Sequence, residues 1–294
     1  MSHLLTIPID EHGLIRDRRF EERLQTATPD AAGITDVFLY SPGWCNPGTS
    51  AQADQSVFSL GFAKALQGLV CASPAQWPRI GAAFAPLALP VHWPSRLAEA
   101  QDPAQRADSV GRHAGYSILR LMIERQTDRQ PCRFNLIGHS FGCRVLCSAL
   151  QMLAQDAGMP ARLACTEFNV ALLQPAADAD SLAPGRQYGR VQSNIPKLRM
   201  LVTTSARDTA LSKWHPEAMG AKGPTGDLIV PVDQRFDVTN EIIPTFTQRL
   251  GVANLTPLHE AAANDRDRAD DSNGQHSHIN LPQVYDLLAR FFCQ

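Results

Sequence analysis

The chain has 294 residues, a hydrophobic content of 44%, a charged content of 19% and a formal net charge of −2 at pH 7. This composition supports a sizeable buried core and excludes an intrinsically disordered chain. The near-neutral charge, without a basic run, gives no electrostatic argument for binding nucleic acid or an anionic membrane surface.

Apolar runs of strand length alternate along the chain with amphipathic stretches of helix length. The predicted strands are 36–40, one within 82–93, 133–138, 167–173, 198–204 and, as a last and more polar edge strand, 232–239. Apolar residues at helical spacing predict helices over 108–126, after Ser140 and over 281–292. The alternation predicts an α/β fold with a mostly parallel sheet flanked by helices.

The stretch "GHSFG" at 138–142 fits the pattern G-x-S-x-G. It follows a predicted strand and opens a predicted helix, which is the context of a nucleophile elbow. In such a turn Ser140 is lifted above the sheet edge, while Gly138 and Gly142 leave room where strand and helix cross. The helix start adds N–H groups and partial positive charge near the reacting centre. We therefore interpret Ser140 as a nucleophile and not as part of a turn without chemistry.

With this motif and its context the chain resembles the α/β-hydrolase family, in its serine esterase and lipase branch, including bacterial hydrolases of poorly known function. The resemblance implies the α/β-hydrolase fold and a triad in the order serine, acid, histidine. Family members often carry a cap domain after the strand that follows the nucleophile helix. Residues 174–197 are too short for more than a helix and loops, so we expect no large cap domain.

The resemblance implies an acid on the loop after a later strand. Asp208, in "LVTTSARDTAL", lies on the loop just beyond the predicted strand 198–204 and is the favoured triad acid. Asp178 and Asp180, after the preceding strand, remain alternatives. The role of the acid would be to fix the tautomer of the histidine and to stabilise the imidazolium.

The family histidine lies in a loop before the terminal helix, followed by a small, a variable and an apolar residue. His276 in "GQHSHINLP" fits this pattern, with Ser277 small and Ile279 apolar. His278 remains an alternative, and His259, which lies further back, is a weaker candidate. A serine hydroxyl needs such an imidazole to take its proton.

The resemblance also implies an oxyanion hole. Its donors would be the backbone N–H groups of Phe141, directly after the nucleophile, and of Trp44, in "YSPGWCNPG". Gly43 matches the family pattern there, whereas Pro42 stands where many members have histidine. Such donors each stabilise the transition state by about 3 kcal/mol.

Further residues are candidates for the pocket. They are Gly43, Trp93 in "VHWPS" and His139, to which we assign no proton transfer. Cys45 and Cys143 lie near the proposed site. A free cysteine more often packs as a small buried residue than acts as a reactive thiol, so we expect both to be buried.

We find no internal repeat or linker and expect a single domain over 1–294. Residues 261–274 are polar and charge-dense, without an apolar period. We expect the segment 240–275, with a short helix over 241–251, to form a mobile loop or a lid over part of the site.

The seven cysteines, odd in number and without a CxxC pair, predict reduced thiols and a cytoplasmic protein. The first residues lack the layout of a signal peptide, and no window reaches the roughly 18 apolar residues of a membrane span. No H-E-x-x-H, P-loop or G-x-G-x-x-G motif is present, so we expect no metal and no cofactor. The oligomeric state stays open.

These features predict a serine hydrolase that cleaves a carboxylic ester, a thioester or a similar acyl bond of a small molecule through an acyl-enzyme on Ser140. An acyltransferase would use the same residues. A hydrolase fold that only binds is the alternative from another class, because fold alone does not establish function. Catalysis is favoured because nucleophile, acid, base and oxyanion glycine stand in the required order.

Overall fold

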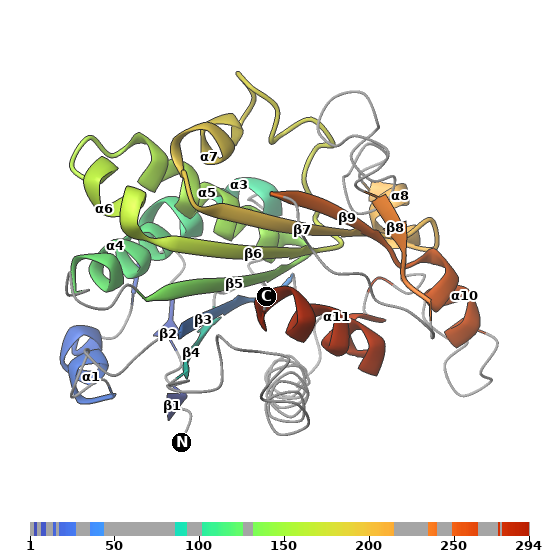
Figure 1. Cartoon of the computed structure of the whole chain (residues 1–294), viewed down its shortest axis with the longest axis horizontal. Coiled ribbons are helices and arrows are strands. Elements are labelled where there is room, and N and C mark those ends of the chain that lie inside the picture. The colour runs from blue at the N-terminus through green and yellow to red at the C-terminus, as the bar shows by residue number, and fades with distance from the viewer. Residues whose placement is uncertain are drawn as a thin grey trace.

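A computed structural model of the chain describes residues 3–4, 7–9, 14–15, 18–27, 36–43, 86–92, 102–125, 132–214, 235–239, 249–263, 276 and 278–293. The strands within these residues are β1 (His3–Leu4), β2 (Ile7–Pro8), β3 (Asp36–Ser41), β4 (Pro86–His92), β5 (Arg133–His139), β6 (Glu167–Leu173), β7 (Leu198–Thr204), β8 (Arg235–Asp237) and β9 (Leu250–Asn254). They pair in the order β1-β4-β3-β5-β6-β7-β9-β8, with β2 also beside β4 (Figure 1). Every neighbouring pair of these strands runs parallel.

The described helices are α1 (Phe20–Ala27), α3 (Pro103–Val110), α4 (Tyr116–Glu124), α5 (Phe141–Gln155), α6 (Pro160–Cys165), α7 (Gly189–Asn194), α8 (Thr209–Trp214), α10 (Thr256–Ala263) and α11 (Pro282–Cys293). A π-helical turn, Gly111–Gly115, joins α3 to α4. The predicted helix over 108–126 is therefore real but begins earlier, at Pro103, where the Asp102 side chain caps the Ala104 N–H.

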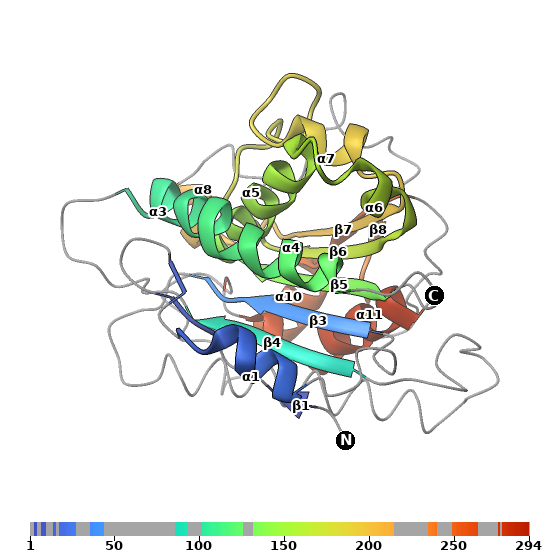
Figure 2. The same cartoon turned by 90° about the vertical axis from the view of Figure 1, so that its left-hand side faces the viewer.

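The sheet carries helices on both faces (Figures 1 and 2). Side chains alternate along the strands, so that Val37 and Leu39 of β3 enter one core and Phe38 enters the other. The first core is closed by residues of α1, α3, α4, α5, α6 and α7, and the second by residues of α10 and α11. This arrangement confirms the predicted parallel sheet flanked by helices.

The prediction for the last strand is wrong in one respect. β8 lies at the sheet edge within the predicted 232–239, but β9 follows it in the chain and inserts between β7 and β8. The helix expected over 241–251 is contradicted at its end, because Leu250 and Gly251 belong to β9. Burial on both sides of the sheet, with Leu250 and Val252 in one core and Ala253 in the other, overrides the low strand propensity of "LGVAN".

The segment after β6 contains no inserted cap. Residues 174–197 form turns and the short helix α7, as their length predicts. In the segment 240–275, residues 249–263 form β9 and α10, while 240–248 and 264–275 lie outside the described residues. The lid therefore stays a prediction, and so does the single domain over 1–294.

A polar ladder crosses the amino-terminal part of the sheet. The carboxylate of Asp36 accepts from Arg133 Nη2 at 2.8 Å and from Asn135 Nδ2 at 3.0 Å. Asn135 Oδ1 in turn accepts from Asn169 Nδ2 at 2.9 Å. Asp36, Asn135 and Asn169 are buried, so the ladder joins β3, β5 and β6 by satisfying polar groups that water cannot reach.

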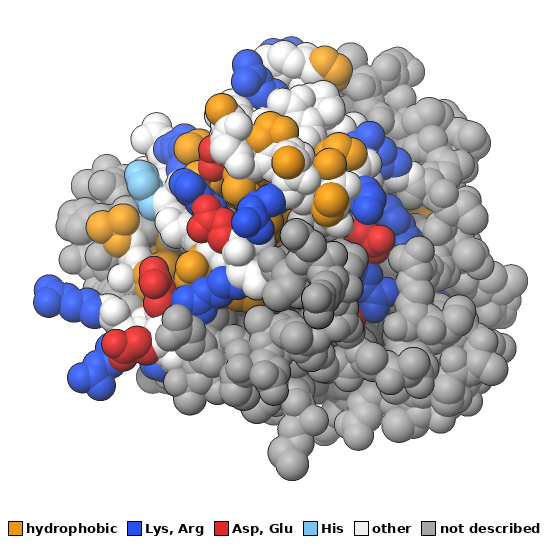
Figure 3. All heavy atoms as spheres, turned by 60° about the vertical axis from the view of Figure 1, so that its left-hand side comes forward, with side chains coloured by type: hydrophobic (Ala, Val, Ile, Leu, Met, Phe, Trp, Pro, Cys, Tyr) orange, Lys and Arg blue, Asp and Glu red, His pale blue; other side chains and the backbone are white. Residues whose placement is uncertain are grey.

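Figure 3 shows the face on which basic and acidic side chains intermingle over the described surface. The pair Arg120–Glu124, with a distance of 2.8 Å and both side chains exposed, is an example from α4. None of the helices in the described part of the chain is long and apolar enough to cross a membrane.

Candidate active site

Ser140 stands between β5 and α5 in a strained turn. Its φ is 54° and its ψ is −124°, a conformation that costs a non-glycine residue on the order of 1–3 kcal/mol. The backbone of β6 and the residues after it hold the turn. The Ser140 N–H donates to Leu173 O at 3.0 Å, and Ser140 O accepts from the N–H groups of Ala176 at 3.2 Å and Cys143 at 3.1 Å. This is the geometry expected of a nucleophile elbow.

Glycines allow three segments to meet at this turn. A Cβ on Gly142 would lie 2.0 Å from Ser41 O, and one on Gly138 would lie 2.8 Å from Cys143 Cα. A Cβ on Gly43 would lie 2.8 Å from Ser140 Cβ. The loop after β3 therefore packs directly on the elbow, which is where the oxyanion loop is expected. Trp44 and Trp93 lie outside the described residues.

Asp208 and His276 form a hydrogen-bonded pair. The Asp208 side chain is fully buried between β7 and α8, and its Oδ2 lies 2.8 Å from His276 Nδ1. Asp208 Oδ1 accepts from the Leu211 N–H at 3.0 Å. A carboxylate at Nδ1 favours the tautomer with a proton on that nitrogen, which leaves Nε2 as an acceptor.

The alternatives from the sequence lie elsewhere. Asp178 is exposed, and Asp180 forms an ion pair of 2.6 Å with Arg186. The ring of His278 contacts the ring of His259 edge to face, with centroids 5.9 Å apart. The structure thus brings Asp208, and neither Asp178 nor Asp180, to His276.

His139, a candidate for the pocket from the sequence, contacts His276. Its Nε2 lies 3.0 Å from the backbone oxygen of His276, and the two rings have centroids 4.8 Å apart. Burial, assisted by the neighbouring His276, lowers the pKa of His139 to about 3. The ring is therefore neutral near pH 7, and its Nε2–H donates to that carbonyl. Sequence reasoning missed this contact because 137 residues separate the two histidines.

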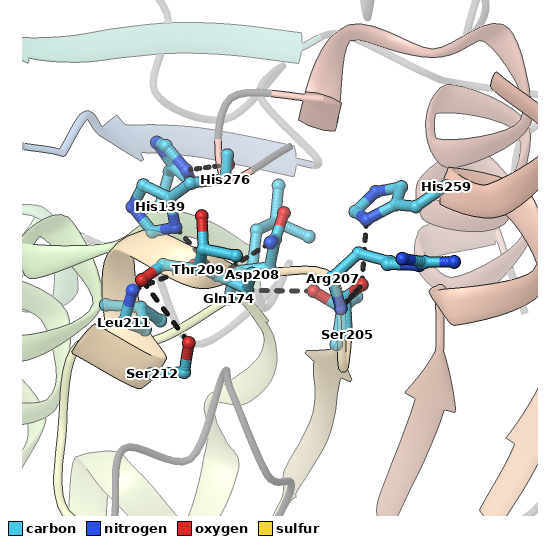
Figure 4. Close-up of polar contacts among 12 residues, drawn as sticks. His139, Gln174, Ser205, Arg207, Asp208, Thr209, Leu211, Ser212, His259 and His276 are labelled. Carbon is cyan, nitrogen blue, oxygen red and sulfur yellow. Dashed lines mark hydrogen bonds and ion pairs between the residues drawn. The ribbon is translucent and has the colours of Figure 1, made fainter. Parts of the chain in front are cut away.

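Gln174 was not singled out from the sequence and is part of the site. It directly follows β6, is fully buried and has a φ of 43°. Its Nε2 donates to Asp208 Oδ2 at 2.7 Å (Figure 4). The letters "LLQP" offer no signal for this contact, since glutamine at a strand end is an ordinary residue.

Helix α10 braces the loop that carries Asp208 (Figure 4). Ser205 Oγ lies 2.9 Å from His259 Nδ1, and Thr256 Oγ1 accepts the Ala206 N–H at 2.9 Å. Next along the loop, Arg207 pairs with Glu260 at 3.1 Å. His259, the weaker candidate for the base, is thus a buried partner of Ser205.

An apolar contact lies beside the elbow. Phe141, the first residue of α5, packs against the buried side chains of Ala176 and Leu211. Cys143, the thiol nearest to Ser140 among the described residues, is buried, and burial raises its pKa well above the ordinary value. The thiol is therefore protonated and unreactive near neutral pH. Cys45 lies outside the described residues.

Comparisons with known proteins place the sequence among hydrolases. The sequence model of a family described as "Alpha/beta hydrolase of unknown function (DUF900)" matches residues 50–214, more than half of the chain, including Ser140 and Asp208. None of the curated proteins searched matches the chain. The crystal structure of a YdeN-like hydrolase from Pectobacterium atrosepticum aligns with 89% of this chain and 100% of its own at 14% identity. Its TM-score is 0.26.

Proposed function

The chain belongs to the family of alpha/beta hydrolases of unknown function, and we propose that it is a serine hydrolase that cleaves a carboxylic ester, a thioester or a similar acyl bond. The observation that carries the proposal is the 2.8 Å hydrogen bond between Asp208 and His276. His139, which precedes Ser140 in the elbow, bonds to the backbone of the same histidine. An imidazole that Asp208 orients, in ring contact with the residue before the strained Ser140, supports a role for His276 in activating the hydroxyl.

The reaction follows in two halves. His276 Nε2 takes the proton of Ser140 Oγ as this oxygen attacks the acyl carbon, and a tetrahedral intermediate forms. When the intermediate collapses, the bond to the leaving group breaks and His276 gives that group its proton. Water then attacks the acyl-enzyme by the same route, so that the carboxylic acid leaves and Ser140 regains its proton. No metal or cofactor is needed.

Two backbone N–H groups would stabilise the oxyanion. That of Phe141 lies at the positive end of α5. The second is assigned to Trp44, because the preceding Gly43 packs against Ser140. The apolar contact among Phe141, Ala176 and Leu211 beside the elbow favours an apolar acyl group.

Labelling with a fluorophosphonate tests the proposal. We expect the probe to modify Ser140, as mapped by mass spectrometry of the modified peptide. H276A should abolish labelling, and D208A should slow it by at least about 100-fold, because the imidazole loses its orientation.

Variants of the alternative candidates for the acid and the base serve as matched controls. D180N and H278Q should label at the rate of the unmodified chain. The proposal would be overturned if the folded protein took no label, or if the H276A variant labelled as well as the unmodified chain. A binding role for the fold would then remain.

A further inference from the structure

Gln174 combines two features that destabilise a folded chain. Its left-handed backbone, with a φ of 43°, is unfavourable for a residue that carries a Cβ. Its side chain is also fully buried, yet Oε1 has no hydrogen-bond partner among the residues that the structure describes. A buried polar atom without a partner is costly. Two such features in one residue indicate a role other than stability.

The contacts of Gln174 converge on the proposed acid. Its Nε2 donates to Asp208 Oδ2 at 2.7 Å, and this oxygen also lies 2.8 Å from His276 Nδ1. Since a carboxylate only accepts, the amide must present its nitrogen to Asp208, which leaves Oε1 as the atom without a partner. The Gln174 N–H donates to Thr203 Oγ1 at 2.9 Å and so pins the residue to β7.

The residues on either side of Gln174 hold the nucleophile. Leu173 O accepts the N–H of Ser140, and the Ala176 N–H donates to Ser140 O. The tetrapeptide 173–176 therefore bonds to the backbone of Ser140 twice and to the side chain of Asp208 once. It is a physical link between the two ends of the proposed triad.

We propose that Gln174 is a positioning residue that orients the carboxylate of Asp208 toward His276. The Leu211 N–H holds Oδ1 and the Gln174 amide holds Oδ2, so that the two donors together fix the plane of the carboxylate. Without the amide the carboxylate can rotate, and His276 loses its orientation. The inference rests on the proposed function, because it assigns Asp208 as the acid of that triad.

The first test compares Q174L, which removes the donor at similar size, with Q151L, which makes the same change in α5. The rate constant for fluorophosphonate labelling of Ser140 should fall about 10- to 100-fold in Q174L, as for the loss of one hydrogen bond to a charged group. Q151L should label at the original rate. In a D208A background Q174L should have less than about a twofold effect, because Gln174 acts through Asp208.

The pH dependence of labelling in the Q174E variant separates an effect on Asp208 from a general loss of packing. Two neighbouring buried carboxylates favour retention of a proton on one of them. At low pH the new carboxyl group can donate to Asp208 as the amide does, and at high pH it is ionised and repels Asp208. The labelling rate of Q174E relative to the unmodified chain should therefore fall as the pH rises from 6 to 9.

Proton NMR separates this inference from the proposed function. The Nδ1–H of His276 should give a downfield resonance that disappears in D208A and is shifted or broadened in Q174L but not in Q151L. If the unmodified chain takes no label, the proposed function fails. The resonance of His276 Nδ1–H then still tests the contact of Gln174 with Asp208. An unchanged resonance in Q174L, an unchanged labelling rate, or an equal loss in the D208A background would overturn the role of Gln174.

Discussion

Ser140 and Gln174 are the non-glycine residues with positive φ in the described part of the chain. They lie at the carboxyl ends of the neighbouring strands β5 and β6, and backbone hydrogen bonds join the two turns. Strained residues persist only where their surroundings hold them, and they concentrate at functional sites. The strain in this chain is thus found where the proposed chemistry is located.

Gly142 stands where the elbow and the loop after β3 leave no room for a side chain. In G142A the new Cβ would lie 2.0 Å from Ser41 O, so that either the elbow or the loop after β3 must move. We expect a loss of about 1–3 kcal/mol in the free energy of unfolding and a strong loss of fluorophosphonate labelling.

Thermal unfolding and labelling measure the two effects. G158A is the control, because Gly158 is exposed and its nearest neighbour would lie 3.2 Å from the new Cβ. A G142A protein that labels normally would show that the close approach is not required.

The second prediction concerns His139, whose folded-state pKa of about 3 lies below the ordinary value of 6.5. The unfolded chain therefore binds a proton that the folded chain does not, and stability falls as the pH drops from 6.5 toward 3. Between pH 7 and pH 4 this histidine should account for a loss of at most about 3 kcal/mol.

Chemical unfolding at pH 7 and pH 4 provides the measurement. The loss on acidification should be smaller in H139Q than in the unmodified chain. H113Q, which replaces an exposed histidine on the π-helical turn, serves as the control. Equal losses in H139Q and in the unmodified chain would contradict the prediction.

At the scale of elements, one buried carboxylate joins α3, α5 and the loop before α7. Asp108 Oδ2 accepts from Arg144 at 2.7 Å and from Gln187 at 2.8 Å, while Oδ1 accepts from Ser148 at 2.8 Å and Tyr188 at 2.5 Å. The helices approach closely here, because a Cβ on Gly111 would lie 2.3 Å from Val145 O. These bonds fix the position of α5 against the rest of the first core.

D108N should destabilise the protein by about 3–5 kcal/mol, because the amide turns one donor toward groups that also donate and leaves Arg144 without its counter-charge. Denaturant unfolding measures the change. E124Q, which breaks the exposed pair with Arg120, should change stability by less than about 1 kcal/mol. A similar small effect in both variants would contradict the role given to Asp108.

Element prediction from the sequence worked where an element carries its own pattern. β6 and β7 are continuous apolar runs, and their observed bounds are the predicted ones. β9 has no such pattern, since glycine, alanine and asparagine make up three of its five residues. It becomes a strand because β7 and β8 pair with it on either side, and the sequence does not contain that information locally.

At the scale of the whole molecule, the carboxyl ends of parallel strands collect residues that are distant in the chain. The elbow motif predicts a nucleophile at Ser140 because strand, turn and helix are adjacent in the sequence. The contact of Asp208 with His276 could be predicted only through the family order of the triad. Gln174 and the contact of His139 with His276 could not be predicted, because they depend on side chains that meet only after folding.

The C-terminal helix α11 closes the second core. Leu287, Leu288 and Phe291 are fully buried there, and Phe292 meets the ring of Phe38 edge to face at 5.7 Å. We expect L288A to lower the free energy of unfolding by about 2–5 kcal/mol, the cost of a cavity in a packed core.

Thermal or denaturant unfolding checks this value. L14A is the control, because Leu14 is 51% exposed and its truncation should change stability by less than about 0.5 kcal/mol. A similar result for both variants would show that α11 contributes little to the core.

The polar ladder of Asp36, Asn135 and Asn169 lies toward the amino-terminal ends of the strands, whereas the proposed chemistry lies at their carboxyl ends. Damage to the ladder should therefore leave each folded molecule competent and reduce only the number of folded molecules. N135L and N169L should then be temperature-sensitive variants. Labelling per folded molecule should stay that of the unmodified chain, while total labelling is lost on mild warming as the protein unfolds. Substitutions in the ladder should thus lower the temperature at which the protein unfolds without changing the proposed site at the other end of the sheet.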